Sequence, residues 1–193
     1  MKVNVHFLGI PSVTLNEKSI TFKYQKAEAV FYFAAYHKSV DRFRLMTVFW
    51  PDEPEENARK NLRNALYSIR QAFGFPVFEN IGQRMIALTS QVMFTSDLET
   101  AADCDQEFLR DFVIKDVPAF DDWLAFTRAE LQDRCKSEIK SRIRQAMESG
   151  GDPEPYYRRL IRMDPYDEET VRALMLHYKR NNQISRSIEL FNQ

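Results

Sequence analysis

The chain has 193 residues, of which 44% are hydrophobic, which is enough for one large or two small domains with a real core. No apolar run of about 18 residues occurs, which argues against a membrane-spanning helix. Two cysteines are too few for a disulfide framework or a metal-spaced cluster. The N-terminus lacks the apolar region of a signal peptide, so we expect a reducing, cytoplasmic location.

The formal net charge of −1 hides an asymmetry between the two halves of the chain. Residues 1–97 contain 12 Lys and Arg against 9 Asp and Glu, a balance of +3. Residues 98–193 contain 15 against 19, a balance of −4. Positive charge is therefore found in the first half, where a polyanion would have to bind.

Short strands are predicted at the N-terminus. Apolar and polar side chains alternate over residues 3–7, 13–15 and 20–22, and Gly9 and Pro11 break the first run. Alternation with a period of two is typical of strands that bury one face. Three short antiparallel strands fit this pattern.

Two helices are predicted next. Residues 25–37 have Ala and aromatic side chains at helical spacing, which favours a buried helix. Asp41 is predicted as the N-cap of a short second helix beginning at Arg42, and Pro51 ends that helix. Arg42 and Arg44 lie at the start of this second helix, where they could reach phosphate.

A third helix spans residues 54–74, with Pro54 suited to its first turn and Gly74 to its C-cap. Its apolar positions fall on one side of a helical wheel, and no acidic residue occurs from Asn57 to Phe78. The opposite side is basic and rich in amides, as a helix that enters the major groove of DNA requires. We predict DNA contacts from Arg59, Lys60, Arg63, Asn64, Tyr67, Arg70 and Gln71, with the central exposed positions reading bases and the arginines contacting the backbone.

A hairpin signal follows this helix. Residues 77–80 and 84–88 are predicted as its strands and Ile81-Gly82 as its turn, and residues 92–94 could add another strand. Arg84 near the tip could enter the minor groove. Strands, three helices and a hairpin in this order predict a winged helix-turn-helix.

The second half changes in composition. Residues 98–122 carry eight acidic and two basic residues, and helical patterns dominate from Trp123. Asp122 and Asp164 are predicted as helix N-caps. Short turns between the helices indicate an antiparallel array similar to tetratricopeptide repeats. Because the last pattern stops within a helix, we expect an N-terminal part of a longer protein, with any sensor beyond Gln193.

Other functions find less support in the sequence. A basic stripe on an amphipathic helix is usually a solvated face, and only its winged-helix setting favours DNA. The three histidines are scattered, so no metal site is predicted. The carboxylate pairs Asp121-Asp122 and Asp103/Asp105 lie in loop-like or capping contexts, and no Gly-rich phosphate loop occurs. We therefore expect no enzyme activity and no cofactor.

Several segments resemble the Streptomyces antibiotic regulatory protein family. The most specific are WPDEPEENARKNLRNAL (50–66) and MDPYDEETVRALM (163–175), and the others are FLGIPSV (7–13), KAEAVFYFAAYH (26–37) and DDWLAFTRAEL (121–131). The resemblance implies an OmpR-like winged-helix DNA-binding domain over residues 1–97. It also implies a bacterial transcriptional activation domain, all-α and similar to tetratricopeptide repeats, over residues 98–193.

The resemblance implies a transcriptional activator that binds direct repeats in double-stranded promoter DNA. The helical domain would then contact RNA polymerase or form a homodimer. The family's wing often has a Gly-Tyr pair where this chain has Gly82-Gln83, so its minor-groove contact does not carry over residue by residue. The alternative is a protein-interaction scaffold in which the winged helix is a docking module that does not bind DNA.

Overall fold

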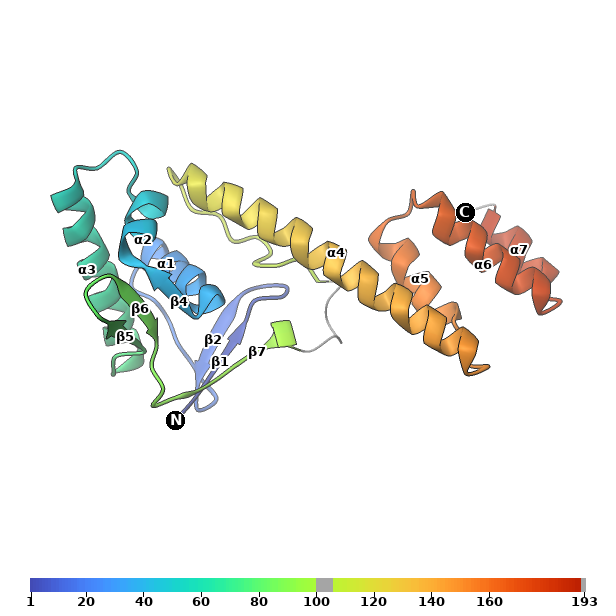
Figure 1. Cartoon of the computed structure of the whole chain (residues 1–193), viewed down its shortest axis with the longest axis horizontal. Coiled ribbons are helices and arrows are strands. Elements are labelled where there is room, and N and C mark those ends of the chain that lie inside the picture. The colour runs from blue at the N-terminus through green and yellow to red at the C-terminus, as the bar shows by residue number, and fades with distance from the viewer. Residues whose placement is uncertain (100–105, 192–193) are drawn as a thin grey trace. The chain divides into compact units, whose positions relative to one another are not determined.

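The computed structural model describes residues 1–99 and 106–191; Asp103, Cys104 and Asp105 lie outside these ranges. The chain divides into two compact units, Met1–Ala129 and Glu130–Gln193 (Figure 1). The long helix α4 (Pro118–Glu148) contributes to both units. The first unit thus extends beyond the boundary predicted at residue 97, because residues 106–129 pack against it. The functions assigned to the two domains stay predictions.

A four-stranded sheet forms one layer of the first unit, in the order β3-β2-β1-β7. Its strands are β1 (Lys2–His6), β2 (Ser12–Leu15), β3 (Lys18–Ser19) and β7 (Met93–Ser96). The first three are antiparallel as predicted, and β7 runs parallel to β1. The third strand is earlier and shorter than predicted because the ring of Phe22 packs into the core, 5.2 Å from that of Phe31.

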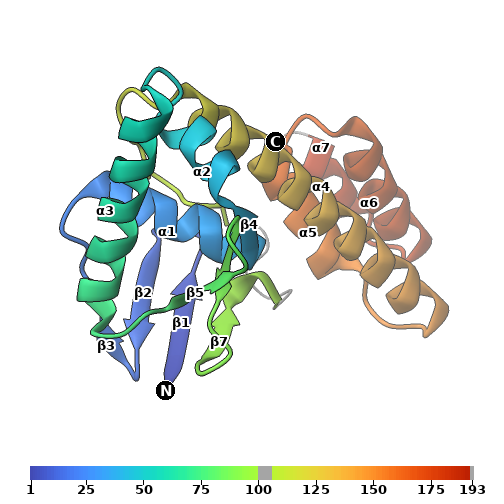
Figure 2. The same ribbon diagram turned by 60° about the vertical axis from the view of Figure 1, so that its left-hand side comes forward.

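Three helices build the core beside this sheet (Figure 2). Helix α1 (Gln25–His37) is buried over most of its length, as its composition predicts. Its Tyr32 ring lies 5.9 Å from Phe7 after β1, and its Phe31 ring lies 5.2 Å from Phe73 of α3 (Glu55–Phe73). Helix α1 therefore joins the sheet to α3. Buried aromatic pairs of this kind add to the stability gained from burial alone.

The ends of the next two helices confirm the predicted caps. Helix α2 (Arg42–Phe49) begins after Asp41, whose Oδ1 accepts a hydrogen bond of 2.6 Å from the backbone N–H of Phe43. Helix α3 ends at Gly74, which has a φ of 76°, a left-handed conformation that glycine adopts without strain. Between them, residues 50–54 form a short turn.

A second sheet forms the wing. Strands β5 (Phe78–Ile81) and β6 (Met85–Leu88) make the hairpin, and β4 (Ser39–Asp41) pairs with β6. Ile81 pairs with Met85 inside the hairpin, so the turn begins at Gly82 rather than at Ile81 as predicted. Gly82 has a φ of 61°, which explains why the reversal falls there. Strands, three helices and hairpin together confirm the winged helix.

The segment that follows the wing packs against the N-terminal part of the first unit. A 3-10 turn, η1 (Asp97–Glu99), follows β7, and Phe108 bridges to Leu8. Arg128 of α4 donates hydrogen bonds of 2.8 Å from Nε to the carbonyl of Phe108 and from Nη2 to that of Leu109. Buried carbonyls of a loop require such partners, and an arginine supplies two in a fixed geometry.

Two predicted N-caps are wrong. Asp122 lies inside α4, which begins at Pro118, because proline is tolerated in a first turn and Phe120 is buried in the first unit. Asp164 follows α5 (Glu154–Met163) as its C-terminal boundary. The N-cap of α6 (Glu168–Arg180) is Asp167, whose carboxylate accepts hydrogen bonds from the backbone N–H and the hydroxyl of Thr170.

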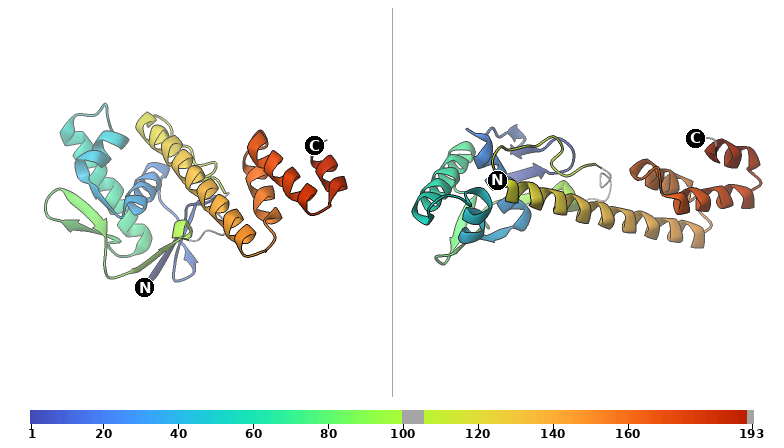
Figure 3. Two further views of the ribbon diagram at one scale, coloured as in Figure 1. Left: turned by 45° about the vertical axis from the view of Figure 1, so that its right-hand side comes forward. Right: turned by 90° about the horizontal axis from the view of Figure 1, so that it is seen from above.

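The second unit is helical. Helices α5, α6 and α7 (Ile184–Phe191) follow α4 in succession (Figure 3). Helix α5 packs against α6, and α6 packs against α7, as short turns predict for an antiparallel array. Across residues 1–99 and 106–191, no helix has both the length and the apolar character needed to cross a membrane.

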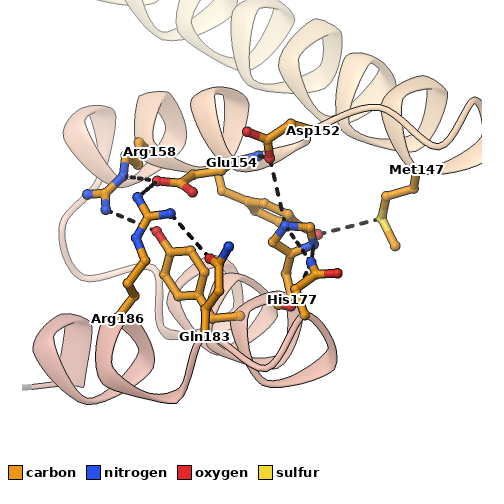
Figure 4. Close-up of polar contacts among 10 residues, drawn as sticks. Met147, Asp152, Glu154, Arg158, His177, Gln183 and Arg186 are labelled. Carbon is orange, nitrogen blue, oxygen red and sulfur yellow. Dashed lines mark hydrogen bonds and ion pairs between the residues drawn. The ribbon is translucent and has the colours of Figure 1, made fainter.

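Glu154 is the centre of a polar cluster that ties these helices together (Figure 4). Its Oε1 accepts bonds of 2.8 Å from Nε of Arg158 and 2.7 Å from Nη2 of Arg186 on α7. Arg158 also donates to the hydroxyl of Tyr178 on α6 at 3.0 Å. One carboxylate at the start of α5 thereby connects α5, α6 and α7.

Candidate nucleic-acid interface

Helix α3 exposes the side that the sequence predicts for DNA. Its apolar stripe, from Ala58 through Leu62 to Phe73, is buried against the first unit. The seven predicted contact residues of this helix all lie on its exposed side: Arg59, Lys60, Arg63, Asn64, Tyr67, Arg70 and Gln71. Tyr67 is the most telling, because 64% of this large side chain is exposed although aromatic residues are usually part of a core. Among residues 1–99 and 106–129, no element covers these side chains.

One flank of α3 borders a groove of about 1120 Å³, which we call the wing groove. It lies between the start of α2, the N-terminal half of α3 and the tip of the wing. Its arginines are Arg42, Arg44, Arg59, Arg63 and Arg84. The fold thus brings together five predicted site residues from three separate segments of the chain.

The wing groove carries excess positive charge. Its two acidic residues are already engaged: Asp41 caps α2, and Glu55 lies 2.5 Å from Nη2 of Arg59. Within the described residues, Arg63 and Arg84 have no carboxylate at ion-pair distance, and both are exposed. Unpaired guanidinium groups on a concave surface attract a polyanion, because each can form charge-assisted hydrogen bonds with phosphate.

The wing is held against α2 by two hydrogen bonds. The backbone N–H of Arg42 donates to the carbonyl of Arg84 at 2.8 Å, and its Nη2 donates to Oδ1 of Asn80 at 2.5 Å. These bonds fix the far wall of the wing groove. The guanidinium of Arg42, which the sequence predicts as a phosphate contact, is hydrogen-bonded to the wing in this structure.

Arg44 also has an internal contact. Its guanidinium lies 5.3 Å from the ring centre of Phe33 on α1, within the range of a cation–π interaction. His37 lies nearby at the end of α1. Burial, followed by the charge of Arg44, lowers the pKa of His37, so this imidazole is neutral near pH 7. The positive charge of the wing groove therefore comes from arginines and does not depend on a histidine.

The other flank of α3 borders a second, smaller groove, which we call the loop groove. It lies between α3 and the loop 21–24 that joins β3 to α1. Asn64, Tyr67 and Gln71 line this side. Lys60 and Arg70 line neither groove. The predicted site residues therefore form three groups: the arginines of the wing groove, the amide and aromatic side chains of the loop groove, and the two exposed residues Lys60 and Arg70 that belong to neither.

The fold places three residues beside these surfaces that no sequence pattern indicated. Phe43 is 65% exposed at the start of α2 and lines the wing groove; its place after a capping aspartate predicted only a helix start. The sequence predicts Asn80 only as the end of a strand, yet its side chain accepts a hydrogen bond from Arg42. Lys23 lines the loop groove. Lys23 lies in a loop, so no helical or strand periodicity in the sequence indicates which residues it lies beside.

Comparison with solved structures identifies the class of architecture. Mycobacterium tuberculosis EmbR, in complex with a low-affinity phosphopeptide, superposes with a TM-score of 0.62 at 14% sequence identity. The match covers 99% of this chain and 58% of the EmbR chain. No protein-family model matches the sequence, and no curated protein matches it. At this identity the likeness shows the fold alone: a winged helix followed by a helical unit.

Proposed function

We propose that this protein is a sequence-specific DNA-binding regulator of transcription. The observation that carries the proposal is the exposed side of α3, bordered by the arginine-rich wing groove. A major groove is wide enough to admit one helix, and a wing beside that helix lies over the neighbouring backbone or minor groove. The resemblance of the sequence to antibiotic regulatory proteins and the winged-helix fold both support this function.

The two flanks of α3 suggest different roles in this complex. Arg59, Arg63 and Arg84 would contact phosphates from the wing groove, because guanidinium groups bind them strongly. Asn64 and Gln71 would read base edges, since an amide can pair bidentately with adenine. The remaining members of the surface are Lys60, Tyr67, Arg70, Arg42 and Arg44.

The finer assignments rest on the resemblance. We propose an activator that binds direct repeats in a promoter and contacts RNA polymerase through its helical unit. A repeated motif spaced by about 10 to 11 base pairs would place neighbouring protomers on one face of the duplex. A binding role of this kind needs no catalytic residues, so we propose no enzyme activity.

The test begins with selection of DNA sequences by the full chain, followed by mobility-shift titration over a range of salt concentrations. Arg63→Ala and Lys60→Ala should each weaken binding, and loss of a phosphate contact should reduce the slope of log K against log salt by about one. Lys115→Ala removes an exposed charge outside α2, α3 and the wing and serves as the control. Unchanged affinity in both α3 variants would refute the interface.

An interaction scaffold without DNA binding is the second candidate. The observation in its favour is the exposed acidic group at the start of α3, formed by Asp52, Glu53, Glu55 and Glu56, which would repel phosphate. This reading predicts that the full chain selects no DNA motif at physiological salt. Strong, salt-dependent affinity for a selected sequence would exclude it as the main function.

A further inference from the structure

The loop groove has the size and composition of a small-molecule site. Its volume is about 550 Å³, and ligand sites commonly measure about 300 to 1000 Å³. The loop contributes Phe22, Lys23 and Tyr24, and α3 contributes Asn64, Tyr67, Ser68 and Gln71. Three aromatic side chains and a few polar groups converge there, which is the usual chemistry of a site for a small organic ligand.

The walls of the loop groove are held in place before any ligand arrives. The ring of Phe22 lies 5.2 Å from Phe31 and 6.1 Å from Phe73, which anchors the loop in the core. The carbonyl of Tyr24 accepts hydrogen bonds from the backbone N–H groups of Ala27 and Glu28 at the start of α1. A preformed wall lowers the entropic cost of binding.

Two polar groups of the loop groove lack partners. Within the described residues, no carboxylate lies at ion-pair distance from the ammonium group of Lys23. The hydroxyl of Ser68 is buried without a hydrogen-bond partner, and only 7% of that residue is exposed. A buried, unsatisfied hydroxyl is uncommon in a folded protein. The groove therefore offers a cation for an anionic group, and the Ser68 hydroxyl lies buried in its wall.

We propose that the loop groove binds a small planar aromatic carboxylate. The rings of Phe22, Tyr24 and Tyr67 would contact its flat faces, and Lys23 would bind its carboxylate. Aromatic side chains prefer stacked or edge-on contacts with a planar ring, and the ammonium group makes its hydrogen bonds to carboxylate charge-assisted. The phosphate backbone of DNA fits inside this groove less well, because the groove offers one cation among largely apolar walls.

The position of the site links the ligand to DNA. Asn64, Tyr67 and Gln71 line the loop groove and also belong to the surface proposed to read bases. A molecule seated there would occupy the same side chains, so the ligand and DNA would compete. This consequence rests on the proposed function, whereas ligand binding itself does not.

The binding test uses the full chain without DNA. The probe is 2-naphthoate, and 2-naphthamide is the uncharged control with the same ring system; calorimetry gives the affinities. We expect 2-naphthoate to bind at least about tenfold more tightly than the amide, and Lys23→Met to remove that difference. Tyr67→Ala should weaken both molecules, and Lys18→Met, an exposed lysine of β3 outside the groove, should change neither. Circular dichroism checks that each variant is folded.

Equal affinity for the two molecules, or unchanged discrimination in Lys23→Met, would overturn the proposed site. A second titration adds 2-naphthoate to the complex with the selected DNA, where release of DNA in the wild type but not in Lys23→Met is expected. Binding of the probe without any effect on DNA would overturn the competition and leave the site standing. A chain that selects no DNA would refute the proposed function, while the first titration would still decide the site.

Discussion

Nη2 of Arg42 lies 2.5 Å from Oδ1 of Asn80, and this bond joins the first turn of α2 to strand β5 of the wing. The backbone N–H of Arg42 bonds to Arg84 on the other side of the hairpin turn. The start of one helix therefore sets the position of the wing tip relative to α3. In the proposed complex, the position of the wing tip relative to α3 decides whether Arg63 and Arg84 can contact the duplex together.

Asn80→Ala should loosen the wing without removing an arginine. The lost bond is exposed, so its contribution to global stability is about 1 kcal/mol or less. Amide hydrogen exchange at Gln83 and Arg84 should become faster, and affinity for the selected DNA should fall a few-fold because ordering the wing becomes part of binding. Gln91→Ala, in the exposed turn before β7, is the control. Unchanged exchange at the wing tip would show that Asn80 does not fix its position.

Glu55→Gln should strengthen DNA binding. The carboxylate of Glu55 pairs with Arg59 one turn further along α3, and both side chains are largely exposed. Such a pair contributes little to stability, so its loss should leave the unfolding midpoint nearly unchanged. The change frees Arg59 and removes a negative charge from the wing groove, which should raise affinity a few-fold at low salt and less at high salt. If Glu55→Gln instead bound DNA more weakly than the wild type, the wing groove would not lie against the phosphates.

Local chemistry made much of the first unit predictable from the sequence. Asp41 and Gly74 identified helix ends because their capping interactions involve only neighbouring residues. The apolar stripe of α3 identified its exposed side, since a 3.6-residue period fixes which residues share a face. The sequence therefore predicted the winged helix and which predicted contacts α3 would expose.

Tertiary contacts account for what the sequence did not reveal. Asp122 resembles an N-cap locally, but burial of Phe120 extends α4 backward to Pro118. Asp164 precedes a proline as an N-cap could, yet the turn places Asp167 at the start of α6. The two grooves flanking α3 likewise depend on loops and strands distant in sequence, which periodicity alone does not position.

Arg128→Met should destabilise the first unit. Arg128 binds the carbonyls of Phe108 and Leu109 and pairs with Glu107 at 2.9 Å, and 30% of its side chain is exposed. Methionine keeps the apolar stem but leaves the two carbonyls without their donor. Hydrogen bonds to a charged group contribute about 1.5 to 3 kcal/mol, so we expect a loss of about 2 kcal/mol in urea unfolding followed by tryptophan fluorescence. Arg110→Met removes a more exposed arginine and should cost much less.

The carboxylate of Glu154 should make the second unit sensitive to acid. Burial, with 13% of the side chain exposed, acts to raise its pKa, but hydrogen bonds with Arg158 and Tyr178 and the charge of Arg186 hold the pKa of Glu154 below its ordinary value. A carboxyl whose pKa is lowered on folding stabilises the folded state above its unfolded pKa. That contribution is lost as the pH falls through the lowered folded pKa.

Glu154→Gln tests this directly. At pH 7 the variant should lose about 1 kcal/mol, because its arginine partners are partly exposed and solvent screens the pairs. Between pH 5 and about pH 3 the wild-type protein should approach the variant, since protonation removes the same charge. Hydrogen exchange in α5, α6 and α7 reports on the second unit, and Glu148→Gln at the end of α4 is the exposed control. A constant difference between wild type and variant across this pH range would mean that the charge of Glu154 does not hold the three helices together.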